Sequence, residues 1–164
     1  MQALHTAATG MAAQELNVQV ISNNIANLRT TGFKKQTAAF QDLIYQHIRR
    51  VGAQSSDQGT ILPVGIDLGG GVKTVGTPRS MTQGTLSQTG NDLDLAITGN
   101  GAAAQPDLKA TVRQGYVEKS NVNSVAEMGR MIDVSRTYAQ IANLLQQQSD
   151  LHKNAINQLA EIPT

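Results

Sequence analysis

The chain has 164 residues, a formal net charge of +1 and no cysteine. The near-neutral charge gives no electrostatic reason to expect nucleic acid or an anionic membrane as a partner, and without cysteine there are no disulfides or thiolate metal sites. The sequence has no run of the ~20 apolar residues that span a membrane and no secretory signal pattern at its start. We expect one or two domains with a thin core and no direct membrane insertion.

The first predicted element is a long helix over residues 4–28. Apolar residues recur along it at spacings of three and four, with Gln14 as the polar exception. This spacing is typical of a narrow helix face that packs against another helix. We therefore predict a subunit interface made by this seam of residues: Leu4, Met11, Val18, Ile21, Ile25 and Leu28.

The middle of the chain predicts turns and short strands. Gly32 suits the end of the helix or a turn, and residues 33–50 fit an extended turn followed by either a short helix or a strand. Residues 52–92 are rich in Gly, Ser, Thr and Gln, which favours short β-strands and exposed loops. The glycine run 69–71 lacks the spacing of a phosphate loop, because Val72 separates it from Lys73.

Residues 90–101 predict one further strand. Leu93, Leu95 and Ile97 alternate with polar or small residues, which is typical of a half-buried strand. The nearby Asp92 and Asp94 lack the other ligands of a calcium loop, so a solvated strand edge is the better interpretation.

The last predicted element is a helix that begins at Ser124, because Ser124 and Glu127 have the spacing of a capping box. Apolar residues again recur at spacings of three and four. They predict the second half of the interface: Met131, Val134, Tyr138, Ile141 and Leu145. The simplest architecture is an antiparallel pair of terminal helices with the middle looped out, although two helices closing an ordinary small bundle fit the pattern equally well.

Residues for catalysis or metal binding are not grouped in this sequence. His5, His47 and His152 each lack a second ligand at helical spacing, and serine does not occur in a G-x-S-x-G elbow. The basic pairs 34–35 and 49–50 are interpreted as solvated surface or subunit contacts. We predict no enzyme activity, no cofactor and no metal.

Three motifs, in this order, resemble the signatures of the bacterial flagellar basal-body rod and hook proteins. The first comprises Asn23, Asn24, Ala26, Asn27, Thr31, Gly32 and Phe33; the second comprises Leu93, Asp94, Leu95 and Gly99; the third comprises Gln114, Gly115, Ser120, Asn121 and Val122. Residues 51–85 resemble the distal-rod members of the family, whereas residues 135–138 and the tail look closer to a proximal-rod paralogue. A chimera of two rod proteins is therefore one reading of the chain.

The resemblance implies an α+β fold with long terminal helices in an antiparallel coiled-coil pair around a small Gly-rich β region. It divides the chain into an N-terminal inner-core helix (1–32), a linker and small β-rich region (33–112) and a C-terminal motif and helix (113–164). The family's outer β domain is missing after Gly101, through a deletion that is either natural or designed.

The function implied by the resemblance is structural. The chain would polymerise into the hollow helical rod of the flagellar basal body, which spans the periplasm, with rod and hook subunits and the bushing rings as partners. The extended stretch 51–85 would contact neighbouring subunits, and export would use the flagellar type III apparatus without a cleaved signal. The alternative is a soluble coiled-coil adaptor or binding module whose helices fold in the monomer.

Overall fold

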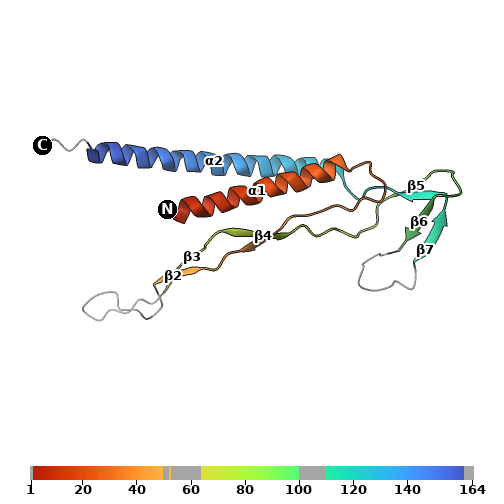
Figure 1. The fold of residues 1–164 in the computed structure, drawn as a ribbon, viewed down its shortest axis with the longest axis horizontal. Coiled ribbons are helices and arrows are strands. Elements are labelled where there is room, and N and C mark those ends of the chain that lie inside the picture. Colours follow the sequence, from red (N-terminus) through yellow and green to blue (C-terminus); the bar gives the residue numbers. More distant parts are fainter. Residues whose placement is uncertain (1, 50–51, 53–63, 100–109, 161–164) are drawn as a thin grey trace. The chain divides into compact units, whose positions relative to one another are not determined.

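The computed structural model describes residues 2–49, 52, 64–99 and 110–160 (Figure 1). Its helices lie at the two ends of the chain: α1 spans Gln2–Ala26 and α2 spans Ser124–Ala160. The strands between them are β1 (Ala39–Asp42), β2 (Gln46–Arg49), β3 (Ile66–Leu68), β4 (Val72–Gly76), β5 (Leu86–Gln88), β6 (Leu95–Thr98), β7 (Thr111–Gln114) and β8 (Tyr116–Glu118). The predicted α+β class is confirmed, and residues 33–50 carry strands.

The described strands pair into four two-stranded sheets: β1 with β4, β2 with β3, β5 with β8, and β6 with β7. The last three of these pairs are antiparallel. Isolated two-stranded ribbons are marginally stable in water. Each ribbon therefore depends on the elements around it, and β6 also lies against β8.

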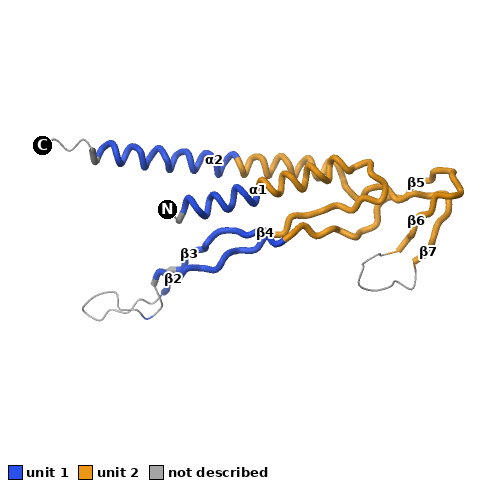
Figure 2. The backbone as a smooth tube through the Cα atoms, viewed as in Figure 1, with its two compact units in different colours: residues 1–13, 40–75, 139–164 blue, residues 14–39, 76–138 orange. Residues whose placement is uncertain are grey.

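The chain divides into two compact units (Figure 2). Unit 1 comprises Met1–Ala13, Phe40–Val75 and Ala139–Thr164, and unit 2 comprises Gln14–Ala39 and Gly76–Tyr138. Each long helix contributes one half to each unit, so we describe the units one at a time. The division into segments 1–32, 33–112 and 113–164 stays a prediction.

Most of the described hydrophobic core belongs to unit 2. Its buried apolar side chains are those of Val20, Ile21, Ala96, Val122 and Val134. Five such side chains make a small core, as expected from a sequence with 3% aromatic residues. The polar contacts of unit 2 therefore take a larger share in fixing its fold.

The two helices make contacts in antiparallel order. In unit 2, the Asn24 Nδ2 atom of α1 lies 3.4 Å from the Glu127 Oε2 atom of α2. In unit 1, a Cβ atom built on Gly10 of α1 would lie 3.9 Å from the Cδ1 atom of Ile141 in α2. Early α1 residues thus meet late α2 residues, whereas coiled-coil packing between the helices stays a prediction.

The start of α2 is where the sequence placed it, but the predicted capping box is wrong. The Oδ1 atom of Asn123 accepts hydrogen bonds from the backbone N–H groups of Val125 (3.1 Å) and Ala126 (3.2 Å), so Asn123 is the N-cap. The side chain of Glu127, assigned by the sequence to the cap, is instead 1% exposed. An asparagine directly before Ser124 caps the helix equally well and leaves Glu127 available for another role.

Candidate functional site

Asn24 forms the centre of a polar site in unit 2. Its side chain is completely buried near the end of α1. The Nδ2 atom donates to the carbonyl oxygen of Gln36 (2.7 Å), and the Oδ1 atom accepts from the Gln36 N–H (2.9 Å). One amide side chain thus pairs with both backbone groups of Gln36 in the way a neighbouring strand would, and it ties the segment after the helix back onto the helix.

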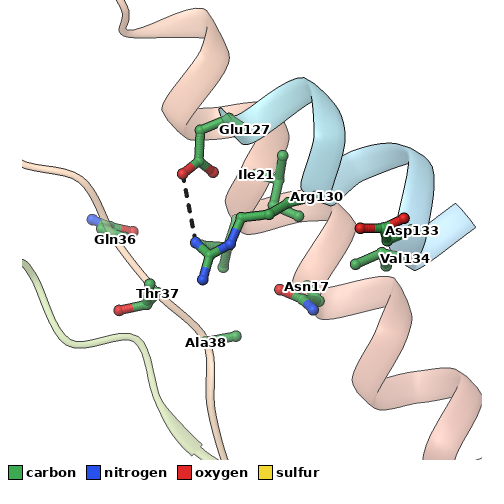
Figure 3. Close-up of a pocket in the computed structure, with 10 residues that line it drawn as sticks. Asn17, Ile21, Gln36, Thr37, Ala38, Glu127, Arg130, Asp133 and Val134 are labelled. Carbon is green, nitrogen blue, oxygen red and sulfur yellow. Dashed lines mark ion pairs between the residues drawn. The ribbon is translucent and has the colours of Figure 1, made fainter. Parts of the chain in front are cut away.

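Glu127 brings the first turn of α2 to the same place. Its buried carboxylate accepts a bond from Asn24 (3.4 Å) and pairs with Lys35 (3.7 Å) and Arg130 (3.5 Å), as Figure 3 shows for Arg130. A buried charge is strongly destabilising unless it is paired and hydrogen-bonded. Two cations and one amide satisfy Glu127, so α1, the segment after it and α2 are joined at one carboxylate.

Asn121 adds the loop that precedes α2. Its Oδ1 atom accepts from the Lys35 N–H (2.7 Å), and its Nδ2 atom donates to the carbonyl oxygens of Ser80 (2.9 Å) and Thr82 (3.0 Å). The Asn121 N–H also donates to the Phe33 carbonyl oxygen (3.3 Å). Residues 33–35, 80–82 and 121 are therefore held together by one amide side chain and its backbone.

Glu118 and Lys34 form the last part of this site. The Lys34 Nζ and Glu118 Oε1 atoms are 2.6 Å apart, and the same oxygen accepts from the Gly84 N–H at 2.6 Å. Burial raises the pKa of the Glu118 carboxyl, but the bonds from Lys34 and Gly84 outweigh it, so the pKa lies below its usual range. A Cβ atom at Gly84 would lie 1.9 Å from the Lys119 carbonyl oxygen, so this position has no room for a side chain.

We call this site the motif junction and define it as Asn24, Lys34, Lys35, Gln36, Glu118, Asn121 and Glu127. The pair Lys34 and Lys35 was interpreted as solvated surface or subunit contact; the solvated-surface alternative is wrong, and a subunit contact stays a prediction. Both side chains are half-buried and form ion pairs with Glu118 and Glu127. Apolar periodicity gives no signal for such residues; their position inside or next to the first and third motifs was the available signal.

A small hollow lies beside the motif junction (Figure 3). Its volume is about 210 Å³, and Ile21 of α1, Ala38 and Val134 of α2 are among its lining residues. Small-molecule sites usually have volumes of about 300–1,000 Å³. The hollow is below that range, so the junction is best understood as a structural joint rather than as a ligand site.

Several other motif residues shape backbone turns in unit 2. Gly32 (φ 68°) and Gly115 (φ 80°) adopt the left-handed conformation that favours glycine. The Gly32 N–H donates to the Glu118 carbonyl oxygen (2.8 Å), which brings the first and third motifs together. Asn27 bonds locally to Asn23 (2.9 Å), and Val122 is buried in the core.

The second motif lies on the β6–β7 ribbon, and the prediction of which side of β6 is buried is wrong. Leu93, Leu95 and Ile97 are 87%, 64% and 66% exposed, whereas Ala96 is buried. Ile97 is opposite Val112 of β7 in the register, and Val112 is also exposed. The buried side of β6 therefore carries the small residue of the alternation, and the large apolar residues lie on its exposed side.

The residues predicted as a subunit interface are mostly half-buried. Ile21 and Val134 are buried in unit 2, and Tyr138 is 43% exposed. The remaining ones are intermediate: Leu4, Met11, Val18, Ile25, Leu28, Met131, Ile141 and Leu145. The fully buried positions of α1 are instead Ala13, Val20, Ile21 and Asn24, so the predicted seam is rotated on the helix away from the side that the chain itself buries.

Among the described residues, His, Cys, Asp and Glu do not form a group of three that could hold a metal ion. His47 pairs with Asp67 across β2 and β3, with Nδ1 and Oδ1 2.5 Å apart. The described helices include none with the length and apolar character needed to cross a membrane.

Comparisons with known proteins match both ends of the chain. Residues 4–34 match the family model "Flagella basal body rod protein", and residues 113–159 match "Flagellar basal body rod FlgEFG protein C-terminal". The flagellar basal-body rod protein FlgG of Caulobacter vibrioides is 52% identical over 132 residues, which is 80% of this chain and 49% of that protein.

More distant relatives cover less of the chain. FlgG of Agrobacterium fabrum is 50% identical over 101 residues (62% of this chain, 38% of that protein). The flagellar hook protein FlgE of Treponema pallidum is 36% identical over 101 residues (62% of this chain, 21% of that protein). The chain thus spans half or less of the length of these curated relatives.

Both matched regions contain residues of the motif junction. Asn24 and Lys34 lie in the N-terminal match, and Glu118, Asn121 and Glu127 lie in the C-terminal match. The contacts between these residues show that the two matched regions form one joint in unit 2. The chain therefore carries, at its two ends, two regions that match the N-terminal and C-terminal family models of flagellar basal-body rod proteins.

Proposed function

We propose that this chain is a structural subunit of the bacterial flagellar rod and that it polymerises into a hollow helical tube through its terminal helices. The observation that carries the proposal is the similarity to the flagellar basal-body rod protein FlgG, at 52% identity over 132 residues. The function is mechanical, and it needs neither a cofactor nor a metal.

The surface of the helices supports assembly. Apart from the buried Ile21, the apolar seam of α1 is only half-buried within its own chain, and α2 carries exposed Met128, Ile132 and Leu144. Apolar side chains that remain exposed in one subunit become favourable contacts when copies pack around an axis in a heterologous, non-closing arrangement. We propose that the coiled-coil pairing of α1 and α2 is completed in this packing.

The remaining assignments follow from the same proposal. The subunit would lie in the basal body and span the periplasm with other rod and hook subunits inside the bushing rings, after export by the flagellar type III apparatus. The outer β domain would be missing after Gly101, and the exposed side of β6 supports this, because a further domain could cover it. The stretch 51–85 would contact neighbouring subunits; its residues 51 and 53–63 lie outside the described residues, as does the joint at 100–109.

Electron microscopy of the purified chain over rising concentration tests the proposal. Tubes that appear together with a gain in helicity by circular dichroism support it. A compact, strongly helical monomer that stays monomeric at every concentration would contradict it and support the adaptor alternative.

A matched pair of variants separates assembly from folding. Leu145→Asp places a charge on the half-buried seam and should abolish tubes, whereas Asn143→Asp changes an exposed side chain two residues earlier on α2 and should not. Ile25→Asp should act like Leu145→Asp. Normal polymerisation of both seam variants would refute the assignment of the seam as an interface.

A further inference from the structure

Unit 1 contains an open apolar groove with a volume of about 910 Å³. Ala3, Ala7 and Gly10 of α1 lie along one side, Leu68 and the glycines after β3 along another, and Ile141 and Leu144 of α2 along a third. Small residues at positions 3, 7 and 10 recur at helical spacing, so they leave space in which another helix could approach closely. Leu68 and Leu144 remain 45% and 59% exposed, so the part of the chain that the structure describes leaves the groove open.

The end of α2 carries exposed apolar side chains that could fill such a groove. Every side chain from residue 149 to residue 158 is exposed, including Leu151 (69%) and Ile156 (64%). Gly10 is opposite Ile141 and the helices run in antiparallel order, so Gln2 is opposite roughly residue 149. The last turns of α2, which we call the α2 tail (149–160), therefore extend beyond α1.

The α2 tail is amphipathic in a way that suits the groove. Leu151, Ala155 and Ile156 lie within an arc of about 140° that also contains His152, and Asp150 and Asn157 lie on the opposite side of the helix. Among the described residues, neither the groove lining nor the apolar side of the tail carries Asp, Glu, Lys or Arg. Burial of one against the other would thus desolvate apolar surface without burying an unpaired charge.

We propose that the α2 tail of one copy fills the unit 1 groove of the next copy. This inference rests on the proposed function, to which it adds the specific contact between successive subunits. Because groove and tail are different surfaces, the contact is heterologous and each bound copy presents a new free tail. Repetition of one such contact produces an open chain rather than a closed dimer.

Cysteine cross-linking tests the contact, because the natural sequence has no cysteine. Ala3→Cys labels the groove, Ile156→Cys labels the apolar side of the tail, and Asn157→Cys labels the polar side as a matched control. A tagged Ala3→Cys chain is mixed with each tail variant and treated with a short bismaleimide. We expect several-fold more mixed dimer with Ile156→Cys than with Asn157→Cys, and equal yields would overturn the proposal.

A chain that carries both Ala3→Cys and Ile156→Cys tests the polarity. A head-to-tail contact gives a ladder of cross-linked oligomers, whereas a product limited to dimers contradicts it. Adding Leu151→Gln should raise the concentration needed for the ladder by roughly tenfold or more, since a buried leucine is exchanged for a polar side chain.

Electron microscopy of the same samples separates this inference from the proposed function. Tubes without a ladder would refute the groove contact and leave the rod function standing. A ladder without tubes would support the contact and refute the rod function, and the absence of both would refute both.

Discussion

Replacement of Asn24 by alanine tests the motif junction most directly. Asn24 is completely buried, and it pairs with both backbone groups of Gln36 and with Glu127. Asn24→Ala leaves the Gln36 N–H and carbonyl without these partners, and an unsatisfied buried polar group costs about 1–3 kcal/mol. Gln36 is half-buried, so water reaches part of the site, and we expect a loss of about 2–4 kcal/mol in the free energy of unfolding.

Asn27 provides a matched control, since it is the same residue type one turn further on. Its amide donates to the Asn23 carbonyl oxygen (2.9 Å) and accepts from Thr30 (3.1 Å), and both bonds are exposed to solvent. Water replaces exposed hydrogen bonds at little cost, so Asn27→Ala should lower the free energy of unfolding by about 1 kcal/mol or less.

Thermal and urea unfolding followed by far-UV circular dichroism measures the difference. For a chain of this size, 1 kcal/mol corresponds to about 2–4 °C in Tm. Asn24→Ala should therefore lower Tm by roughly 5–15 °C and Asn27→Ala by less than about 4 °C. Similar losses in the two variants would refute the argument that the buried bonds of Asn24 hold unit 2 together.

Three further predictions concern unit 2. Gly84→Ala should lower the free energy of unfolding by about 2–4 kcal/mol, because the new Cβ atom would meet a backbone carbonyl. Gly76 has open space around it, so Gly76→Ala should change the free energy of unfolding by about 0.5 kcal/mol or less. Urea unfolding compares the two variants. The folded pKa of Glu118 is lower than its ordinary value of 4.5, so its ion pair stabilises the fold above that pH, and this stabilisation is lost as the pH falls through the folded pKa. Glu118→Gln should therefore reduce the loss of stability at acid pH in a pH-dependent unfolding curve. An unchanged loss at acid pH would contradict the assignment. Ile97→Thr should leave Tm nearly unchanged and reduce aggregation measured by light scattering. Ala96→Leu should overpack the buried side of β6 and lower Tm. A larger loss of Tm in Ile97→Thr than in Ala96→Leu would show that the apolar side of β6 faces the core.

The sequence predicted the helices well because their signal is periodic and long. The expected first helix over residues 4–28 corresponds to α1 at Gln2–Ala26, and the second was placed correctly at Ser124. The buried side of α1 was not predictable by the same rule. Asn24 is polar, so a periodicity argument places it on the exposed side of the helix. Its bonds to Gln36 and Glu127 instead place that side of α1 in the interior. The more apolar seam, with Met11, Val18 and Ile25, remains half-exposed.

The pairing of the charged residues in the motif junction could not be predicted from the sequence for a related reason. Lys35 and Glu127 are 92 positions apart along the chain, and a pairing at this separation depends on the fold. Local rules therefore assigned Glu127 to a helix cap and Lys35 to the surface. Only the motif pattern indicated that these regions matter together, because the first motif ends next to Lys34 and the third ends shortly before Glu127.

Unit 2 buries polar groups and leaves large apolar residues outside, and this division has a physical reason in the proposed repeating assembly. Directional bonds at Asn24 and Glu127 fix one geometry with few apolar side chains, so residues such as Leu95 and Ile97 remain available for contacts outside the chain. In a polymer every surface charge is repeated in each copy, and a net charge of +1 keeps this repulsion small. A charge placed on the seam, as in Leu145→Asp, is likewise repeated in each copy and desolvated at each contact, which is why it should affect assembly far more than the fold of a single chain.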